Sequence, residues 1–159
     1  TIVNVQGDEP MVSPEDIQTI IEVHRSNPSL VVNGYVPLSP HENPARTTIP
    51  KVVLDEQENL LYISRRDIPG SKSPEARSDP TSYLKQVCIY AFSSDHLEKY
   101  AAHQKKTPLE AAEDIEILRF LEMGQRVKMV RTQTSSLAVD TPEDVVVVEE
   151  AMRTLGLQP

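Results

Sequence analysis

The sequence is poor in cysteine and glycine, and it contains no long apolar run. A membrane-spanning helix needs about 20 consecutive apolar residues, so we predict no transmembrane segment. The single cysteine, Cys88, has no partner for an internal disulfide and lies in an apolar run, which indicates a core residue in the reducing cytoplasm. The five glycines form neither G-x-G-x-x-G nor G-x-x-x-x-G-K-[ST], so neither phosphate-binding loop is present.

Basic residues are also scarce relative to acidic ones, and the formal charge is -8. Binding to a nucleic-acid backbone needs clustered basic side chains that displace counterions, so we expect no nucleic-acid partner. Phosphate groups still bind to an acidic protein when a divalent cation bridges them to carboxylates. The composition therefore favours a metal-dependent phosphate site over a basic one.

The length of 159 residues fits a single α/β domain over residues 1–159, which can bury a core without disulfides or structural metal. The sequence opens inside an apolar segment, Thr1-Ile2-Val3, without an initiator methionine. We expect it to be the C-terminal portion of a longer protein.

Short apolar runs alternate with segments that begin in helix-capping residues, which predicts an α/β fold with a mostly parallel sheet. Lys51-Val52-Val53-Leu54 and Leu60-Leu61-Tyr62-Ile63 flank five polar residues and predict an inserted antiparallel hairpin. Other strands are expected near 3–5, 30–32, 86–92 and 127–130, and helices over 14–26, 94–97, 108–123 and from 142 towards 156.

The expected helix over 108–123 starts in the capping box Thr107-Pro108-Leu109-Glu110 and should run for about four turns to Gly124. On this helix Glu113 and Glu116 lie between apolar residues. A carboxylate in that setting is costly without a partner, so one of them would point into a polar cavity. The alternative, that both reach solvent at the edge of the apolar stripe, stays open.

Two aspartates near the two ends of the chain are the candidate catalytic residues. Asp8 comes directly after the first expected strand, the position at which α/β sheets place their ligands. The alternative for Asp8 is a turn residue that caps nearby backbone. Asp140 precedes the cap of the last helix, so its carboxylate is not needed there. We predict that the two carboxylates share one divalent cation.

Arg65 and Arg66 follow the hairpin. Two adjacent guanidinium groups bind a carboxylate well, although a solvated surface pair is the commoner meaning of such a dipeptide.

Four motifs occur in the order that one enzyme family shows, and they cover nearly the whole chain. They are Val3-Asn4-Val5-Gln6-Gly7-Asp8-Glu9-Pro10, Leu61-Tyr62-Ile63-Ser64-Arg65 followed by Ile68-Pro69, Pro108-Leu109-Glu110 with Glu116-Ile117-Leu118-Arg119, and Val139-Asp140-Thr141-Pro142-Glu143-Asp144. Together they resemble the 3-deoxy-manno-octulosonate cytidylyltransferases, or CMP-Kdo synthetases. The related acylneuraminate cytidylyltransferases share the fold but generally lack the Gln-Gly-Asp-Glu-Pro form.

The resemblance implies a Rossmann-like fold of the nucleotide-diphospho-sugar transferase type. It implies transfer of CMP from CTP to the anomeric hydroxyl of an acidic sugar, with release of pyrophosphate, for lipopolysaccharide or capsule synthesis. It also implies that Asp8 and Asp140 hold Mg²⁺, and that the protein is a homodimer in contact through the hairpin and the strand after it. The residues implied to face the substrate are Gln6, Arg65, Gln86, Tyr90 and Glu116.

Two positions depart from the family pattern. Gln86 stands where a histidine is usual, and Ile117 where a glutamine often follows the glutamate. Both positions are implied to face the sugar, so a sialate-like nonulosonate or a modified octulosonate remains an alternative substrate. A non-catalytic domain of the same fold is a further alternative. The family's N-terminal nucleotide-binding segment is absent from these 159 residues, so we expect the chain alone not to turn over CTP.

Overall fold

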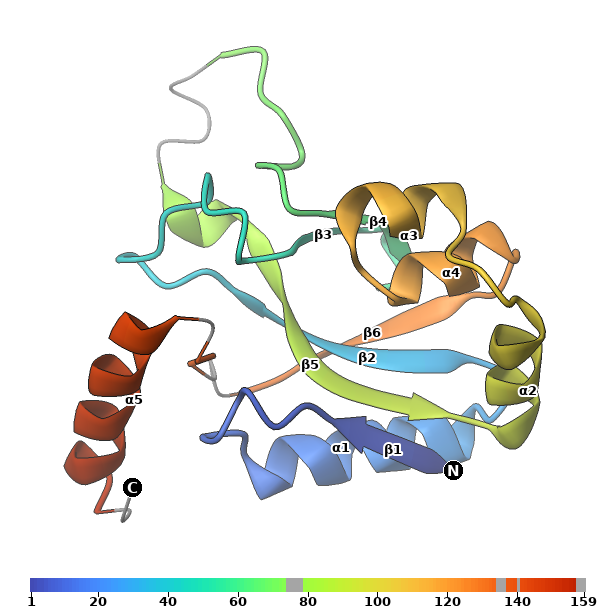
Figure 1. The fold of residues 1–159 in the computed structure, drawn as a ribbon, viewed down its shortest axis with the longest axis horizontal. Helices are drawn as coiled ribbons and strands as arrows, with labels where there is room; N and C mark the ends of the chain where they lie inside the picture. Colours follow the sequence, from blue (N-terminus) through green and yellow to red (C-terminus); the bar gives the residue numbers. More distant parts are fainter. Residues whose placement is uncertain (74–78, 134–136, 140, 157–159) are drawn as a thin grey trace.

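The structure is a computed structural model that describes residues 1–73, 79–133, 137–139 and 141–156 (Figure 1). Its strands are β1 (Ile2–Val5), β2 (Val31–Pro37), β3 (Lys51–Leu54), β4 (Leu60–Ser64), β5 (Leu84–Phe92) and β6 (Val127–Arg131). Its helices are α1 (Pro14–Ser26), the 3₁₀ turn η2 (Pro80–Ser82), α2 (Ser94–Ala102), α3 (Pro108–Glu113), α4 (Ile117–Glu122) and α5 (Pro142–Thr154).

The helix starts follow the capping chemistry of the sequence. The Ser13 side chain accepts hydrogen bonds from two backbone amides at the start of α1, where Pro14 occupies the first helical position. Thr141 and Asp144 form a capping box on α5. The predicted short helix over 94–97 is longer, because it starts after the cap Ser93 and continues to Ala102.

β5 is the centre of a six-stranded sheet in the described part of the chain, which has the order β4-β3-β5-β2-β6. β2 pairs along one edge of β5, while β3 and β1 pair with different stretches of its other edge, all three antiparallel to it. The α/β class and the hairpin of β3 with β4 are thus confirmed.

Most of the described strands run in the same direction, as a mostly parallel sheet requires. The prediction is wrong for hydrogen-bonded neighbours, which are mostly antiparallel. Among the described strands, β1, β2, β3 and β6 run one way and β4 and β5 the other, and β2 with β6 is the one parallel pair. The reason is that β5, whose nearly continuous apolar sequence is typical of a parallel strand, enters the centre of the sheet in the opposite direction.

Two apolar clusters cover the two faces of the sheet. On one face α1 contributes Ile20, which packs with residues of β2, β5 and β6: Val32, Val36, Val87, Ile89, Ala91 and Val130. On the other face α4 and the residues before it pack on the sheet through Ile115, Ile117, Leu118 and Phe120. Burial of each such side chain stabilises the fold by about 1.5–3 kcal/mol, so these helices are held firmly.

The predicted four-turn helix over 108–123 is wrong, because it breaks into α3 and α4. Asp114 adopts a left-handed conformation with φ of 54° and ends α3, which an aspartate tolerates better than most residues. Glu116 then stands at the cap of α4. The predicted stop at Gly124 is confirmed, where φ is 72°.

α5 lies at the opposite end of the molecule from α2 (Figure 1). It exposes Val145, Val146 and Val147 and buries Val148. Both α1 and α5 have 13 residues, and no helix in the described ranges is long and apolar enough to cross a membrane.

Candidate active site

A cavity of about 300 Å³ gathers residues from both halves of the chain. Its walls come from the turn after β1, from β5, from the loops after β2, β4 and α3, and from α5. The predicted site residues in its lining are Gln6, Asp8, Arg65, Gln86, Tyr90 and Glu116. The remaining predicted residue, Asp140, lies outside the described residues. The fold therefore brings all the described candidates to one place.

Asp8 presents a carboxylate oxygen that the described residues do not satisfy. Its Oδ1 atom is buried and has no hydrogen-bond partner in that part of the structure. A buried carboxylate oxygen without a donor is costly unless a ligand supplies the missing interaction. Because no described amide donates to Oδ1, this oxygen does not serve as the turn cap that was the alternative interpretation.

The segment 137–139 runs beside the Asp8 turn. The Val139 amide donates to the Asp8 carbonyl oxygen at 2.8 Å, and Leu137 and Ala138 line the cavity. Val139 is the residue before Asp140 in the sequence. Backbone from the far end of the chain is thus fixed next to Asp8.

The site residues are compatible with Mg²⁺. The described residues hold no group of three or more histidine, cysteine, aspartate or glutamate side chains arranged around a common point. Mg²⁺ does not need such a group, because it usually keeps several waters and binds one or two carboxylates together with substrate phosphates. The unsatisfied, buried Oδ1 atom of Asp8 suits one such coordination position.

Gln86 is oriented by a buried hydrogen-bond network at a β-bulge. The register of β2 against β5 shifts between Asn33 and Gly34. There the Gln86 Nε2 atom donates to Asn33 Oδ1 at 2.9 Å, and Asn33 Nδ2 donates to the carbonyl oxygens of Val87 and Ile89. This bond uses one of the two N–H groups of the Gln86 amide and fixes the orientation of the side chain, which lines the cavity.

Arg65 is held in place by backbone carbonyl groups. Its Nε atom donates to Glu113 O at 2.6 Å, its Nη1 atom to Thr47 O at 3.0 Å and its Nη2 atom to Asp114 O at 3.0 Å. These bonds use three of the five N–H groups of a guanidinium. The side chain is therefore pre-positioned at the cavity wall with N–H groups left for a ligand.

The two glutamates of the expected long helix have different surroundings. Glu113 accepts hydrogen bonds from the Ser64 hydroxyl at 2.5 Å and from the Arg65 amide at 2.9 Å, so it supports the end of β4. Glu116 lines the cavity. Glu116 is also solvent-exposed, so it fits the cavity alternative by its position and the solvent alternative by its exposure.

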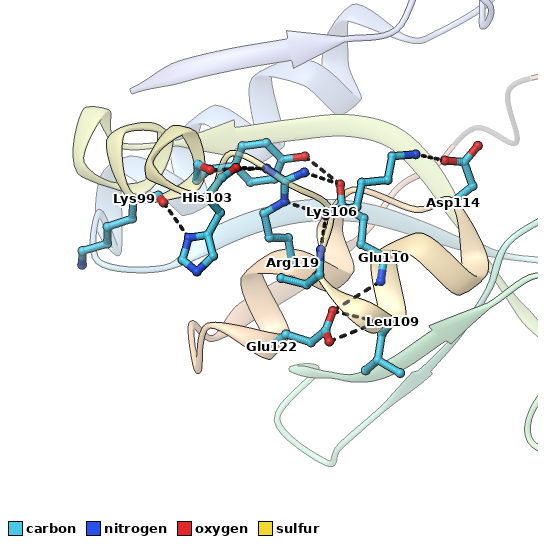
Figure 2. Close-up of polar contacts among 10 residues, drawn as sticks. Lys99, His103, Lys106, Leu109, Glu110, Asp114, Arg119 and Glu122 are labelled. Carbon is cyan, nitrogen blue, oxygen red and sulfur yellow. Dashed lines mark hydrogen bonds and ion pairs between the residues drawn. The ribbon is translucent and has the colours of Figure 1, made fainter.

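A buried ion pair fixes this break (Figure 2). Arg119 donates from Nε and Nη2 to the two carboxylate oxygens of Glu110, at 2.6 and 2.7 Å, and Tyr100 donates to the same carboxylate. The Arg119 guanidinium also lies 3.8 Å from the centre of the Tyr100 ring. Burial alone would raise the pKa of Glu110, but these hydrogen bonds and that of the Thr107 amide outweigh it and lower the pKa.

A second carboxylate, that of Glu122 at the end of α4, contacts the start of α3. Both oxygens of Glu122 accept from the Leu109 amide at 3.1 Å, and one accepts from the Glu110 amide (Figure 2). These bonds occupy otherwise unpaired donors of the first turn of α3. Both helices are thereby locked together, and Glu116 is held between them.

Glu9 is a residue of the site that sequence reasoning missed. Its Oε1 atom accepts from the Cys88 amide at 3.1 Å, which extends the pairing of the chain with β5 beyond the end of β1. Burial, and then the Glu9 carboxylate, raise the pKa of the Cys88 thiol, so the thiol is protonated and is a poor nucleophile. Burial likewise raises the pKa of Tyr90 well above its usual value, so its hydroxyl keeps its proton.

Two ion pairs at the cavity wall were also missed. Lys85 pairs with Glu42, and Arg46 lies 4.0 Å from Asp144 of α5. All four residues line the cavity. No sequence spacing signals these pairs, because each joins segments that are distant in the chain.

A second cavity of about 240 Å³ adjoins the first and shares Gln6, Tyr90 and Glu116 with it. The rest of its lining is mostly apolar and comes from β5, α2 and α4: Phe92, Leu97, Tyr100, Ile117 and Phe120, together with Asn4.

Comparison with known proteins identifies relatives of this chain. A protein-family model described as Cytidylyltransferase matches residues 1–129. The 3-deoxy-manno-octulosonate cytidylyltransferase of Protochlamydia amoebophila is 36% identical over 152 residues, which cover 94% of this chain and 57% of that protein. The enzyme of the same name from Zea mays is 36% identical over 157 residues, covering 99% of this chain and 52% of the relative.

A solved structure has the same fold. It is titled as CMP:2-keto-3-deoxy-manno-octonic acid synthetase complexed with CTP, and it superposes with a TM-score of 0.82 at 32% identity. The match covers 96% of this chain and 61% of that one. The chain thus spans a little over half the length of the relatives it matches.

Proposed function

This chain belongs to the cytidylyltransferase family, and we propose that the protein transfers CMP from CTP to the anomeric hydroxyl of an acidic sugar, releasing pyrophosphate. The observation that carries the proposal is that Gln6, Asp8, Arg65, Gln86, Tyr90 and Glu116 line the same cavity of about 300 Å³. We propose 3-deoxy-manno-octulosonate as the sugar, since relatives at 36% identity carry that substrate in their names. Lipopolysaccharide or capsule synthesis would consume the product.

Arg65 is the proposed ligand of the sugar carboxylate. Its guanidinium is already fixed by three backbone carbonyl groups, so little side-chain entropy would be lost on binding. Gln6, Tyr90 and Glu116 lie around the same cavity and offer hydrogen-bond partners for hydroxyl groups. Gln86, held by Asn33, would add a carbonyl acceptor in a fixed direction. The wall therefore combines the Arg65 cation for the sugar carboxylate with polar partners for the sugar hydroxyl groups.

Asp8 and Asp140 are the residues that we propose to hold Mg²⁺. When bound, the ion would shield the nucleotide charge and polarise the α-phosphate towards attack by the hydroxyl. The support in this structure is the buried Oδ1 atom of Asp8, which lacks a partner among the described residues, and the hydrogen bond of Val139 to the Asp8 backbone. Asp8 would orient the ion, and the Glu9–Cys88 hydrogen bond would keep the Asp8 turn against β5.

The protein is further proposed to form a homodimer through the hairpin of β3 and β4. β4 stands at one end of the strand order and exposes Leu61 at 59% of its surface. The strand after the hairpin, β5, pairs on both edges and is buried, so the hairpin supplies the contact. The cytoplasm is the proposed compartment, consistent with a single cysteine.

Measuring pyrophosphate release from CTP by the full-length protein, with a panel of acidic sugars, tests the assignment. The panel contains 3-deoxy-manno-octulosonate, a sialic acid and a blank without sugar, and ATP replaces CTP as the nucleotide control. We expect release only with CTP, and a kcat/KM at least about tenfold higher with the octulosonate than with the sialic acid. A preference for the sialic acid would establish the sialate-like alternative, and absence of release with every sugar would favour a non-catalytic domain.

A further inference from the structure

Lys51, at the start of β3, is completely buried although it carries an amino group. Its Nζ atom donates to three backbone carbonyl oxygens: Arg46 O at 2.8 Å, Ile49 O at 2.6 Å and Arg65 O at 2.6 Å. A lysine ammonium has three N–H donors, so all of them are used. A charge buried this deeply is tolerated only because its partners are complete.

The three carbonyl groups belong to two segments of the cavity wall. Arg46, Thr48, Ile49 and Pro50 line the cavity from the loop after β2, and Arg65 lines it from the end of β4. The Lys51 ammonium connects the two segments because it donates to carbonyl groups of both. The Arg65 side chain adds a second connection through its hydrogen bond to Thr47 O at 3.0 Å. The side chains of Lys51 and Arg65 thus donate hydrogen bonds to the carbonyl oxygens of residues 46, 47 and 49.

We propose that Lys51 is a positioning residue that fixes the 46–49 segment and Arg65 at the cavity wall and thereby sets the affinity of the site for its acidic sugar. The inference rests on the proposed function, in which Arg65 binds the sugar carboxylate. Lys51 itself does not line the cavity, so it acts through the carbonyl groups that it holds. Its loss should weaken sugar binding more than it slows the chemical step.

The charge state of Lys51 should matter as well. Burial lowers its pKa to about 8, with the Arg65 guanidinium acting in the same direction and the carboxylates of Asp67 and Glu113 opposing it. A neutral amine has two N–H donors for three carbonyl groups, so one carbonyl is released above that pH. Sugar affinity is therefore expected to fall as the pH rises from about 7 to about 9.5.

The test compares Lys51→Met with Lys128→Met in the otherwise unchanged full-length protein. Lys128 is a matched control, because it also donates to a loop carbonyl, Gln57 O at 2.6 Å, but Gln57 does not line the cavity, in contrast to the residues that Lys51 holds. We expect Lys51→Met to raise the KM for 3-deoxy-manno-octulosonate about tenfold, with less than about a twofold change in kcat and in the KM for CTP. Lys128→Met should match the wild type.

The pH profile needs no variant and covers the case in which Lys51→Met does not fold. The wild-type KM for the sugar should rise between pH 7 and 9.5, and in Lys51→Met this rise should be lost. An unchanged sugar KM in Lys51→Met, or a wild-type KM that is constant over this range, would overturn the proposal.

A readout independent of turnover is the rate of tryptic cleavage after Arg46, followed by mass spectrometry. Release of the Arg46 carbonyl should make cleavage about tenfold faster in Lys51→Met than in the wild type or Lys128→Met. If the wild type releases no pyrophosphate with any sugar, the proposed function fails and this comparison alone decides the role of Lys51. Equal cleavage in the three proteins would then refute it.

Discussion

Gly34 sits at the β-bulge that shapes the Gln86 side of the cavity, and it leaves no room for a side chain. A Cβ atom placed there would lie 3.2 Å from Thr132 Cγ2, 3.2 Å from Val87 Cβ and 3.3 Å from Ile20 Cδ1. All three neighbours are buried, so none moves away freely. We predict that Gly34→Ala lowers the free energy of unfolding by about 1–3 kcal/mol, measured by urea denaturation.

Gly70→Ala is the control for that measurement, since no atom lies within 4 Å of a Cβ built at Gly70. Its free energy of unfolding should stay within about 0.5 kcal/mol of the wild type. A Gly34→Ala protein as stable as the wild type would show that the β2–β5 bulge yields to the added methyl group.

At the scale of single residues, the sequence located the candidates but not what surrounds them. Asp8 stood out because it follows an apolar strand and precedes a turn, and that position is at the cavity. Glu9 lies in the same motif, yet its hydrogen bond to the Cys88 amide depends on β5 arriving alongside β1. Sequence spacing carries no information on such a contact between segments about 80 positions apart.

At the scale of elements, the α3–α4 turn depends on the buried pair of Glu110 and Arg119. Removing one partner leaves the other charge buried without compensation, which costs about 3–5 kcal/mol. We predict that Arg119→Met lowers the free energy of unfolding by this amount and also raises the KM for the sugar, because Glu116 loses its support. Urea denaturation and steady-state kinetics of the same preparation measure the two effects.

The double variant Arg119→Met with Glu110→Leu provides the control, since an apolar pair of similar size avoids the uncompensated charge. It should recover most of the lost stability but not the sugar KM. If Arg119→Met alone is as stable as the wild type, the ion pair does not hold the two helices.

His96 makes the start of α2 sensitive to pH. Its Nδ1 atom accepts from the Ser93 amide at 3.2 Å, which requires an unprotonated nitrogen. Burial lowers its pKa below 6.5, so the folded protein binds fewer protons than the unfolded chain and stability is lost as the pH falls below about 6.5. Burial also lowers the pKa of His24, so protonation of His24 likewise reduces the stability of the fold as the pH falls.

We therefore predict that His96→Gln makes the free energy of unfolding fall less steeply between pH 7 and 5 than in the wild type. His41→Gln, at an exposed loop position, should keep the wild-type slope. Identical slopes in all three proteins would mean that protonation of His96 costs the fold nothing.

Helix starts and the hairpin were the predictable elements, because capping residues, proline at the first helical position and a polar five-residue connection act locally. The break at Asp114 was not predictable. A capping box and an unbroken apolar stripe both favour one helix. The Arg119–Glu110 bonds that accompany the break, and the hydrogen bond of Tyr100 from α2 to the same carboxylate, are tertiary contacts that the local sequence does not reveal. The direction of β5 was missed because a strand's apolar run does not encode its orientation.

At the scale of the molecule, the edge strand β4 with its exposed Leu61 predicts how two copies meet. Leu61→Lys should shift the protein from dimer to monomer at micromolar concentration, because a buried ammonium opposes an apolar contact. Size-exclusion chromatography with light scattering measures the change. Leu155→Lys, which alters an equally exposed leucine beyond α5, should leave the dimer intact. A monomeric wild type, or a dimeric Leu61→Lys protein, would rule out this interface.

The share of the relatives' length that this chain covers bears on the expected activity of the 159 residues. The chain covers 57% and 52% of the two relatives compared, so their remaining length has no counterpart in the alignment. Our expectation that the 159 residues alone do not turn over CTP stays a prediction. The family and the fold, in contrast, follow from matches that cover at least 94% of the chain.

The proposed metal site is tested most directly by pyrophosphate release by the Asp8→Asn variant of the full-length protein, because the site depends on the Asp8 Oδ1 atom, which has no partner among the described residues. With saturating CTP, Mg²⁺ and 3-deoxy-manno-octulosonate, we predict a loss of at least about 100-fold in kcat. The free energy of unfolding should be unchanged or higher, since the variant removes a negative charge at a buried oxygen that has no partner among the described residues. Asp95→Asn, at an exposed position on α2, should keep full activity. An Asp8→Asn protein with activity within about threefold of the wild type would contradict the proposed metal site at Asp8.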